Sequence, residues 1–572
     1  MNVAVVGSGP AAEAVVAALG DADATVERAG LDRVGDADLA VVVGAAGDDG
    51  FERANDAALD AAVPWLAVEV GGVGGRRREG VPGGVSALGP DGPCFRCLAL
   101  RCDSVAGDGV EDGATTRADA RLAGAHAGRL AVSAVEGTAV AGTVVESGPV
   151  PTRRELLAVP NCPACGAGRD RTLGRDDAER SLDDAAAAAD RAVDERLGPV
   201  AVVGEQESYP APYYLAESGS TTGFSDAAAN RQAAGVAADW NAAYVKAIGE
   251  ALERYAAGTY REDEFEVATR DDLERAVSPT AFVTPSDAPV ASHGDDLAWV
   301  PGEHLASGSA TSLPASFVHF PPPDEEYRPA ITTGLGLGNS TVGALRSGLR
   351  EVLERDAAML AWYSTFEPLG LAVDDADFDA LARRARSEDL TVTPLLLTQD
   401  VDVPVVAVAV HRDEWPRFAL GSAAHLDGTA AAVDALEEAL QNWMELRGLG
   451  PEDAADADAA IGRYAEFPEA AREFLDVDTT VPVGDVGPDT VPEGEAALEE
   501  LVSRAADAGV EAYAARLTTR DLEALGFEAV RVLAPAAQPL FVEEPYFGER
   551  ARTVPDELGF EARLDRPFHP FP

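Results

Sequence analysis

Two stretches of this chain repeat the same arrangement of charges within a helical apolar period. Residues 250–254 and 351–355 both read Glu-x-x-Glu-Arg. At 3.6 residues per turn, the charged members of each copy share one side of a helix. A solvated face with i,i+4 ion pairs would explain a single copy. Two copies predict a site in which Glu250, Glu253, Glu351 and Glu354 hold Mg²⁺ that bridges to phosphate, while Arg254 and Arg355 bind the remaining phosphate charge.

The first of these helices also carries an unusual cation. Lys246 is the only lysine in the sequence, and it lies one turn before Glu250. Its position on the charged side of the helix predicts that it assists the two arginines at a bound triphosphate.

The composition limits the class of protein. With 572 residues, the chain is expected to form two or more domains. A formal net charge of −54, spread along the sequence, indicates adaptation to molar salt and a halophile-like proteome. The same charge excludes nucleic acid as a partner, because no basic patch is available.

The sequence also predicts a cytoplasmic protein. It contains no apolar run of 18 residues and no charged-then-apolar leader, so no membrane segment is expected. Its five cysteines are accordingly expected to be reduced or bound to a metal.

The N-terminal segment alternates strands and helices. Val3–Val6, Leu39–Val43 and Leu66–Val70 are predicted strands, and Glu52–Ala62 is a predicted helix. This order indicates a parallel sheet in a Rossmann-like layer. The turn over residues 7–12 would let phosphate approach a helix N-terminus, but it fits an ordinary helix start equally well.

Two Cys-x-x-Cys pairs predict a closed, structural zinc site. They are Cys94 with Cys97, and Cys162 with Cys165. Each pair offers two thiolates from a tight turn, and two pairs complete a tetrahedron. A redox dithiol or buried, unligated thiols are the alternatives. The largely helical segment Arg121–Val144 would fill the gap between the pairs, and Cys102 is left over.

The chain is predicted to divide into residues 1–170, an acidic helical linker at 171–199, and a second domain at 200–572. Ala227–Tyr255 is predicted as one long helical run. The glycines of Thr332–Ser340 would bring backbone amides close to a ligand, and Asn339 and Ser340 can cap the helix that follows. The predicted fold class is therefore α/β and α+β.

These motifs resemble the YcaO family. A Gly-Asn step leading into Glu351-x-x-Glu354-Arg355 is similar to one family motif, and Lys246–Tyr255 matches another, with Lys246 where the family has serine. Ser347 holds the serine position in the second copy. Glu438-x-x-Gln441, on a predicted helix at Ala430–Arg447, resembles a third motif, although Trp443 stands where the family has arginine and Arg447 lies a turn further on. An ordinary amphipathic core helix would explain this segment equally well.

The N-terminal domain resembles the ThiF-like scaffold that accompanies YcaO proteins. It has a glycine turn, a Rossmann-like layer and two Cys-x-x-Cys pairs, but no arginine-rich adenylating motif follows the turn. The resemblance implies a catalytically silent scaffold that helps to hold a peptide. The sequence begins at the first strand, without a preceding winged-helix leader-binding module.

The family resemblance implies an ATP-dependent cyclodehydratase that forms azolines from Cys, Ser or Thr in a precursor peptide. The expected cofactors are ATP, Mg²⁺ and structural Zn²⁺. Besides the glutamates and arginines named above, Lys246, Asn339, Ser347, Glu438 and Gln441 would bind the nucleotide. The proline-rich tail Arg566–Pro572 resembles a family tail that reaches the active site, and Pro572 would then supply a carboxylate base.

The motifs leave other functions open. A thioamide-forming enzyme would carry the same residues, and a non-catalytic module that presents a peptide is a further alternative. A leader-binding or dehydrogenase partner protein and a homodimer are compatible with the resemblance.

Overall fold

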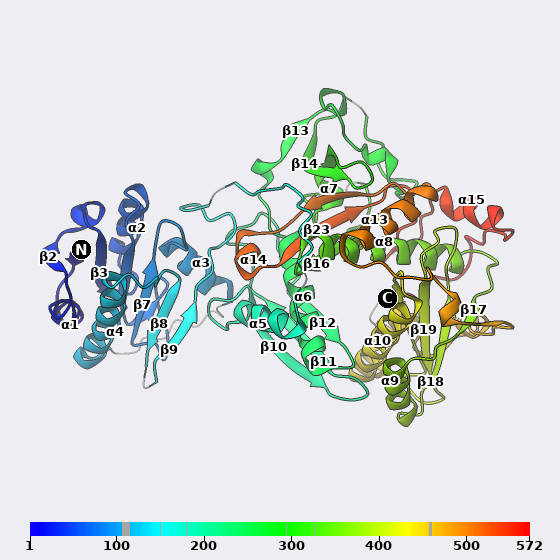
Figure 1. The fold of residues 1–572 in the computed structure, drawn as a ribbon, viewed down its shortest axis with the longest axis horizontal. Coiled ribbons are helices and arrows are strands. Elements are labelled where there is room, and N and C mark those ends of the chain that lie inside the picture. The colour runs from blue at the N-terminus through cyan, green and yellow to red at the C-terminus, as the bar shows by residue number, and fades with distance from the viewer. Residues whose placement is uncertain are drawn as a thin grey trace.

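The computed structural model describes residues 1–105, 115–148, 150–166, 168–178, 180–292, 294–324, 327–456 and 460–572. The protein is a mixed α/β molecule, as predicted. One layered sheet with its helices stands at the N-terminal end, and the remaining sheets and helices form a larger body beside it (Figure 1).

The N-terminal sheet has seven strands in the order β2-β1-β3-β4-β7-β8-β9. Pairing is parallel among the first four strands and antiparallel from β4 onward. The prediction of a parallel sheet is therefore correct only for one half. After β4 the chain returns through the short ribbon of β5 and β6, and antiparallel neighbours need no crossover helix. The strands are β1 (Asn2–Val6), β2 (Thr25–Ala29), β3 (Leu39–Ala45), β4 (Trp65–Val70), β5 (Gly72–Val73), β6 (Arg76–Arg77), β7 (Gly83–Leu88), β8 (Thr143–Ser147) and β9 (Thr152–Glu155).

Alternating side chains of this sheet bury helices on both faces. Leu39 and Val41 of β3 pack with α1 (Pro10–Leu19) and α4 (Arg117–Val135), whereas Ala40 and Val42 pack with α2 (Gly50–Asp60) and α3 (Phe95–Val105). The helix predicted within 121–144 thus starts earlier and ends before β8.

The second part begins with the antiparallel sheet β10 (Val200–Glu207), β11 (Tyr213–Ser218) and β12 (Gln232–Val236). Helix α6 (Trp240–Ala257) packs against it, together with α5 (Leu182–Ala192). The single helix predicted over Ala227–Tyr255 is wrong in its first half. Residues 232–236 pair with β11 instead, and the small alanines of this segment are compatible with either conformation.

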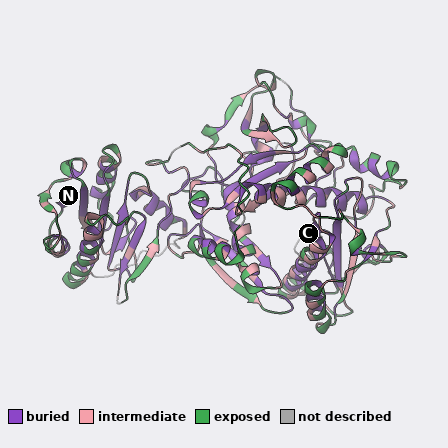
Figure 2. Ribbon diagram, viewed as in Figure 1, coloured by how far each residue is buried: buried purple, intermediate pink, exposed green. Residues whose placement is uncertain are grey.

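Helix α8 (Thr341–Trp362) is the central element of the larger body. It packs on strands of the sheet β13-β14-β22-β23-β16 and on β20 and β19 of the sheet β20-β19-β18-β17-β21. Most of its residues are buried, as Figure 2 shows for this region. The strands of these sheets are β13 (Glu266–Ala268), β14 (Leu297–His304), β15 (Ser309–Pro314, which pairs with β14), β16 (Leu335–Gly338), β17 (Leu369–Ala372), β18 (Thr391–Leu396), β19 (Val405–His411), β20 (Phe418–Ala424), β21 (Thr480–Pro482), β22 (Tyr513–Arg516) and β23 (Glu528–Leu533).

The remaining helices complete the body. The sheet that contains β19 carries α8 on one face and α9 (Ala376–Ser387) with α10 (Gly428–Asp456) on the other. Further helices are α7 (Ala315–Val318), α11 (Ala460–Tyr464), α12 (Glu469–Phe474), α13 (Gly494–Asp507), α14 (Arg520–Leu525) and α15 (Arg550–Glu557). Within the described ranges, no helix has both the length and the apolar character needed to cross a bilayer.

Candidate active site

Three strand–helix units each hold one glutamate of the predicted site in place. In every unit, a backbone N–H at or beside the strand donates to a carboxylate on the helix that follows it. Such a bond fixes the carboxylate rotamer without using another charged group. The pairs are Ala234 to Glu250 on α6 (2.7 Å), Gly334 to Glu351 on α8 (3.0 Å) and Ser422 to Glu438 on α10 (2.6 Å).

Glycine makes this close approach of strand and helix feasible. A Cβ atom at Gly336 would lie 2.3 Å from the Ala344 carbonyl oxygen, and one at Gly235 would lie 2.2 Å from the Ala247 nitrogen. The glycines of Thr332–Ser340 therefore allow β16 to pack on α8, which differs from the ligand-contacting loop predicted for them. The capping prediction is confirmed at Ser340, whose side chain accepts a bond from the Gly343 N–H (3.1 Å).

Arg355 links the glutamates of α8 and α10 to the C-terminal tail. Its guanidinium lies 3.5 Å from Glu354, 4.0 Å from Glu351 and 3.7 Å from Glu438. The same group donates a hydrogen bond to a backbone oxygen of Pro572 (2.7 Å). The Arg355 guanidinium thus contacts the second Glu-x-x-Glu-Arg copy, the third motif and the tail.

The carboxylates are crowded enough to resist ionisation. Burial, together with the charges of Glu351 and Glu250, raises the pKa of Glu253 to about 8. Burial also raises the pKa of Glu354 to about 8, against the opposing effect of Arg355. Such a group of mutually repelling carboxylates favours a bound cation.

Ser422 is a site residue that the sequence did not reveal. Its hydroxyl donates a hydrogen bond to Glu354 (2.6 Å), while its backbone N–H donates one to Glu438. No motif marks this serine, because its role depends on β20 lying between α8 and α10.

A cavity of about 450 Å³ adjoins the first motif, between β10–β12 and the helices α6 and α10. Glu250 and Arg254 line it, as does Gln441 of the third motif. Glu445 also lines it and was not predicted, although it follows Gln441 by one turn of α10. Burial raises the pKa of Glu445, and the charge of Glu250 adds to the rise.

The other predicted nucleotide residues lie on or next to these helices. Lys246 pairs with Glu437 (2.5 Å) and Asp434 (3.5 Å), which ties α6 to α10. Its side chain remains 47% exposed. Ser347 is half-buried on α8, and the buried Oδ1 of Asn339 has no hydrogen-bond partner among the residues that the structure describes.

Trp443 and Arg447, the two residues near the arginine position of the third motif, make contacts away from the predicted site. Trp443 is fully buried, and the Arg447 guanidinium stacks 4.4 Å from its ring centre. Arg447 also pairs with Glu207 and Glu388. Neither residue lines the cavity beside Glu250, so the arginine of that motif has no counterpart there.

The C-terminal tail is held along its length. The Trp362 ring N–H donates to the Pro567 carbonyl (2.9 Å), and the Tyr464 hydroxyl donates to the Phe568 carbonyl. His569 and Phe571 are almost completely buried. The prediction that this apolar tail lies in a groove is confirmed, and its end lies against Arg355.

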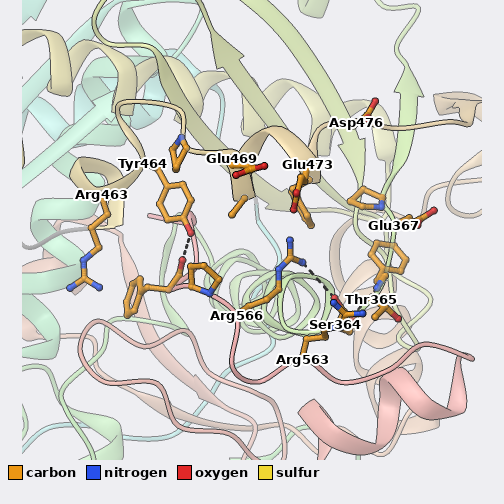
Figure 3. A pocket seen from close by; sticks show the side chains of 17 residues that line it. Ser364, Thr365, Glu367, Arg463, Tyr464, Glu469, Glu473, Asp476, Arg563 and Arg566 are labelled. Carbon is orange, nitrogen blue, oxygen red and sulfur yellow. Dashed lines mark hydrogen bonds between the residues drawn. The ribbon is translucent and has the colours of Figure 1, made fainter.

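A larger cavity, of about 910 Å³, lies elsewhere, beside residues 566–568 of this tail (Figure 3). Arg563 and Arg566 line it together with Tyr464 and Glu473. It contains none of the glutamates of the three motifs. Size alone therefore does not identify the candidate active site.

The four predicted zinc ligands form a compact cluster. In the described part of the chain, they are the one group of three or more candidate ligands whose donor atoms all lie within 4.8 Å. The Sγ separations are 3.9 Å for Cys94–Cys97, 3.7 Å for Cys94–Cys162 and 3.4 Å for Cys97–Cys165. Tetrahedral zinc with bonds of about 2.3 Å separates its sulfurs by about 3.8 Å, so the cluster fits that ion. Cys102 is buried outside it.

Known proteins resemble the chain in sequence and in fold. An uncharacterized protein of Methanothermobacter thermautotrophicus is 27% identical over 334 residues, which cover 56% of this chain and 85% of the relative. A heterocyclase solved with substrate and cofactor superposes with a TM-score of 0.76 at 20% identity, covering 99% of this chain and 84% of that one. The heterocyclase TruD gives 0.68 at 20% identity, with 98% and 82% covered. At these identities, the two structures establish a shared fold.

The family assignment comes from the sequence profile described as YcaO cyclodehydratase, ATP- and Mg²⁺-binding, which matches residues 234–538. This range begins at the strand residue that holds Glu250 and includes all three helices of the site. Because it spans more than half of the sequence, the chain belongs to the YcaO family of ATP- and Mg²⁺-binding cyclodehydratases.

Proposed function

We propose that this enzyme uses Mg²⁺ and ATP to activate a backbone amide of a ribosomally made precursor peptide, and so forms an azoline from Cys, Ser or Thr. The observation that carries the proposal is the meeting of Glu351, Glu354, Glu438 and the chain end at Pro572 around one arginine, Arg355. The heterocyclases of similar fold support the azoline product.

The chemistry balances without a redox partner. The side-chain thiol or hydroxyl gives its proton to a base and adds to the preceding carbonyl carbon, and the resulting oxyanion takes the γ-phosphoryl group of ATP, which leaves ADP. The carbon–oxygen bond then breaks, phosphate departs and the amide nitrogen loses its proton as C=N forms. Phosphorylation is needed because phosphate is a far better leaving group than the amide oxygen.

Each group of the site has a defined task in this proposal. Glu250, Glu253, Glu351 and Glu354 hold Mg²⁺, since carboxylates combined with substrate phosphates are its preferred ligands. Arg254, Arg355 and Lys246 bind the triphosphate charge. Asn339, Ser347, Glu438 and Gln441 complete the nucleotide site.

Pro572 supplies the base. A terminal carboxylate is ordinarily a weak base, with a pKa of about 3.5. Arg355 donates a hydrogen bond to Pro572 and would hold the carboxylate in position for proton transfer. The fully buried Phe571 next to it limits the freedom of the chain end.

The N-terminal part acts as a ThiF-like scaffold with one structural zinc. We assign it residues 1–170, the connecting segment residues 171–199 and the YcaO domain residues 200–572. The density of acidic residues suits a protein that works in concentrated salt.

The test is calorimetry on the full chain. Glu250→Gln combined with Glu351→Gln should abolish Mg²⁺-dependent ATP binding, whereas Glu262→Gln combined with Glu469→Gln should leave it intact. Mass spectrometry of the peptide should then show the loss of one water per ring, whereas a thioamide enzyme would exchange oxygen for sulfur. Unchanged affinity in the first double variant would refute the assigned site.

A further inference from the structure

We propose that Arg101, Tyr255 and Asp521 form a positioning triad through which the N-terminal domain sets the place of the α6 carboxylates in the Mg²⁺–ATP site. The inference rests on the proposed function. It concerns three residues to which the proposed function gives no task.

The triad joins three distant parts of the chain in one buried network. Arg101 of α3 donates to the Tyr255 hydroxyl (3.2 Å) and forms an ion pair with Asp521 of α14. The Tyr255 hydroxyl in turn donates to Asp521 (2.7 Å). All three side chains are at most 1% exposed, so water does not replace these contacts.

Tyr255 anchors the side of α6 that is opposite Glu253. It directly follows Glu253 and Arg254, and it lies about 200° around the helix from Glu253 at roughly 100° per residue. The carboxylates therefore face the nucleotide site while the hydroxyl faces the N-terminal domain. A side chain anchored on the side of a helix opposite its carboxylates restricts both the rotation of the helix and the depth at which those carboxylates lie.

The far end of the triad is equally fixed. Arg101 lies one turn after Cys97, at the cysteine cluster. The Arg520 guanidinium donates to the Cys165 carbonyl (2.9 Å), and Asp521 is the next residue. Asp521 also accepts bonds from the Thr519 hydroxyl and the Leu522 N–H (3.0 Å). The triad thus connects α6 to the cysteine cluster of the N-terminal domain.

A buried ion pair by itself is weak evidence for stability, so the role assigned to this triad is to fix geometry. The geometry matters at this place because two helices must present carboxylates to one cation. A displacement of about 1 Å is enough to change an active-site affinity or rate by about a hundredfold.

Tyr255→Phe tests the triad with little risk to folding. It removes the bridging hydroxyl, keeps the ring and leaves Asp521 paired with Arg101. We expect the Kd for a non-hydrolysable Mg²⁺–ATP analogue and the KM for ATP to rise about tenfold, while the KM for the peptide stays unchanged. Tyr260→Phe is the matched control, because Tyr260 is equally buried and its hydroxyl bonds only within the second domain, to the Pro321 carbonyl (3.2 Å).

A second variant distinguishes a change in the position of α6 from a loss of folding. Arg101→Met combined with Asp521→Asn removes the ion pair without leaving a buried charge unpaired, and it should raise the same Kd. Wild-type Kd in both triad variants, or an equal rise in Tyr260→Phe, would overturn the inference while the proposed function stands. Absence of nucleotide binding in the wild-type protein would instead refute the proposed function, and this inference with it.

Discussion

At the scale of single residues, the site gathers more carboxylates than its own arginines pair with. Glu253 and Glu354 both have a pKa raised to about 8 by burial. Arg355 approaches three carboxylates, but it cannot satisfy all of them with short contacts. Groups held in such a state are typical of functional sites, because a ligand rather than the protein completes their environment.

Ser422 provides a test at this scale. Ser422→Ala deletes the hydroxyl that donates to Glu354 and keeps the backbone N–H that serves Glu438. A hydrogen bond to a charged group contributes about 1.5–3 kcal/mol, so the Kd for Mg²⁺–ATP should rise at least roughly tenfold in calorimetry.

The matched control for that variant is Ser218→Ala. Ser218 is also buried, but its hydroxyl donates to the neutral Ala251 carbonyl (3.3 Å). Equal nucleotide affinities in the two variants would show that the Glu354 contact does not matter for binding.

At the scale of elements, the sequence predicts the helices better than it predicts the strands and the distant segments that contact them. The helices α6, α8 and α10 follow from apolar periodicity and repeated charges within each segment. Strand β12 was missed, because its residues (QAAGV) carry no strand signal apart from pairing with β11. The contact of Arg355 with Pro572 spans 217 residues, and no local pattern encodes it.

The C-terminal tail should respond to acid through His569. Its ring nitrogens lie 2.8 Å from the Phe541 carbonyl oxygen and 3.1 Å from the Phe571 carbonyl oxygen, and burial lowers its pKa to about 4. The folded pKa is below the unfolded value of about 6.5, so docking of the tail is complete above pH 6.5. It weakens as the pH falls towards 4, by about 3 kcal/mol in total.

Hydrogen exchange of the backbone amides in residues 564–572, corrected for intrinsic rates, measures this loss. His569→Gln removes the titrating group and should make exchange in the tail nearly independent of pH over that range. The same pH dependence in both proteins would assign the effect to other groups.

The position of the tail leads to a second test. Removing Phe571 and Pro572, or appending residues after Pro572, should abolish peptide modification while ATP binding survives, because the proposed base is displaced from Arg355. The same residues appended before Met1 are the control. Normal modification by the C-terminally extended protein would show that the tail only packs.

At the scale of the whole molecule, the two parts share one interior. A single buried cluster contains Cys94, Cys97 and Cys162 from the N-terminal part together with Ile248 and Tyr255 of α6 and Leu522 of α14. The two parts are therefore packed together through this shared interior and are not joined by a flexible hinge alone. The cysteine spacing predicted that the four cysteines would cluster, but nothing in the sequence showed that the cluster would lie at this junction.

The metal content tests that arrangement. We expect one zinc per chain by elemental analysis, and Cys162→Ser should lose it because a closed site needs all four sulfurs. Binding of structural zinc contributes on the order of 10 kcal/mol to folding, so the variant or a chelator should unfold the N-terminal part in a thermal melt. Cys102→Ala is the matched control, since Cys102 is equally buried but lies outside the cluster. Because the cluster adjoins α6, loss of zinc should also weaken Mg²⁺–ATP binding, and full affinity in zinc-free protein would show that the two sites are independent.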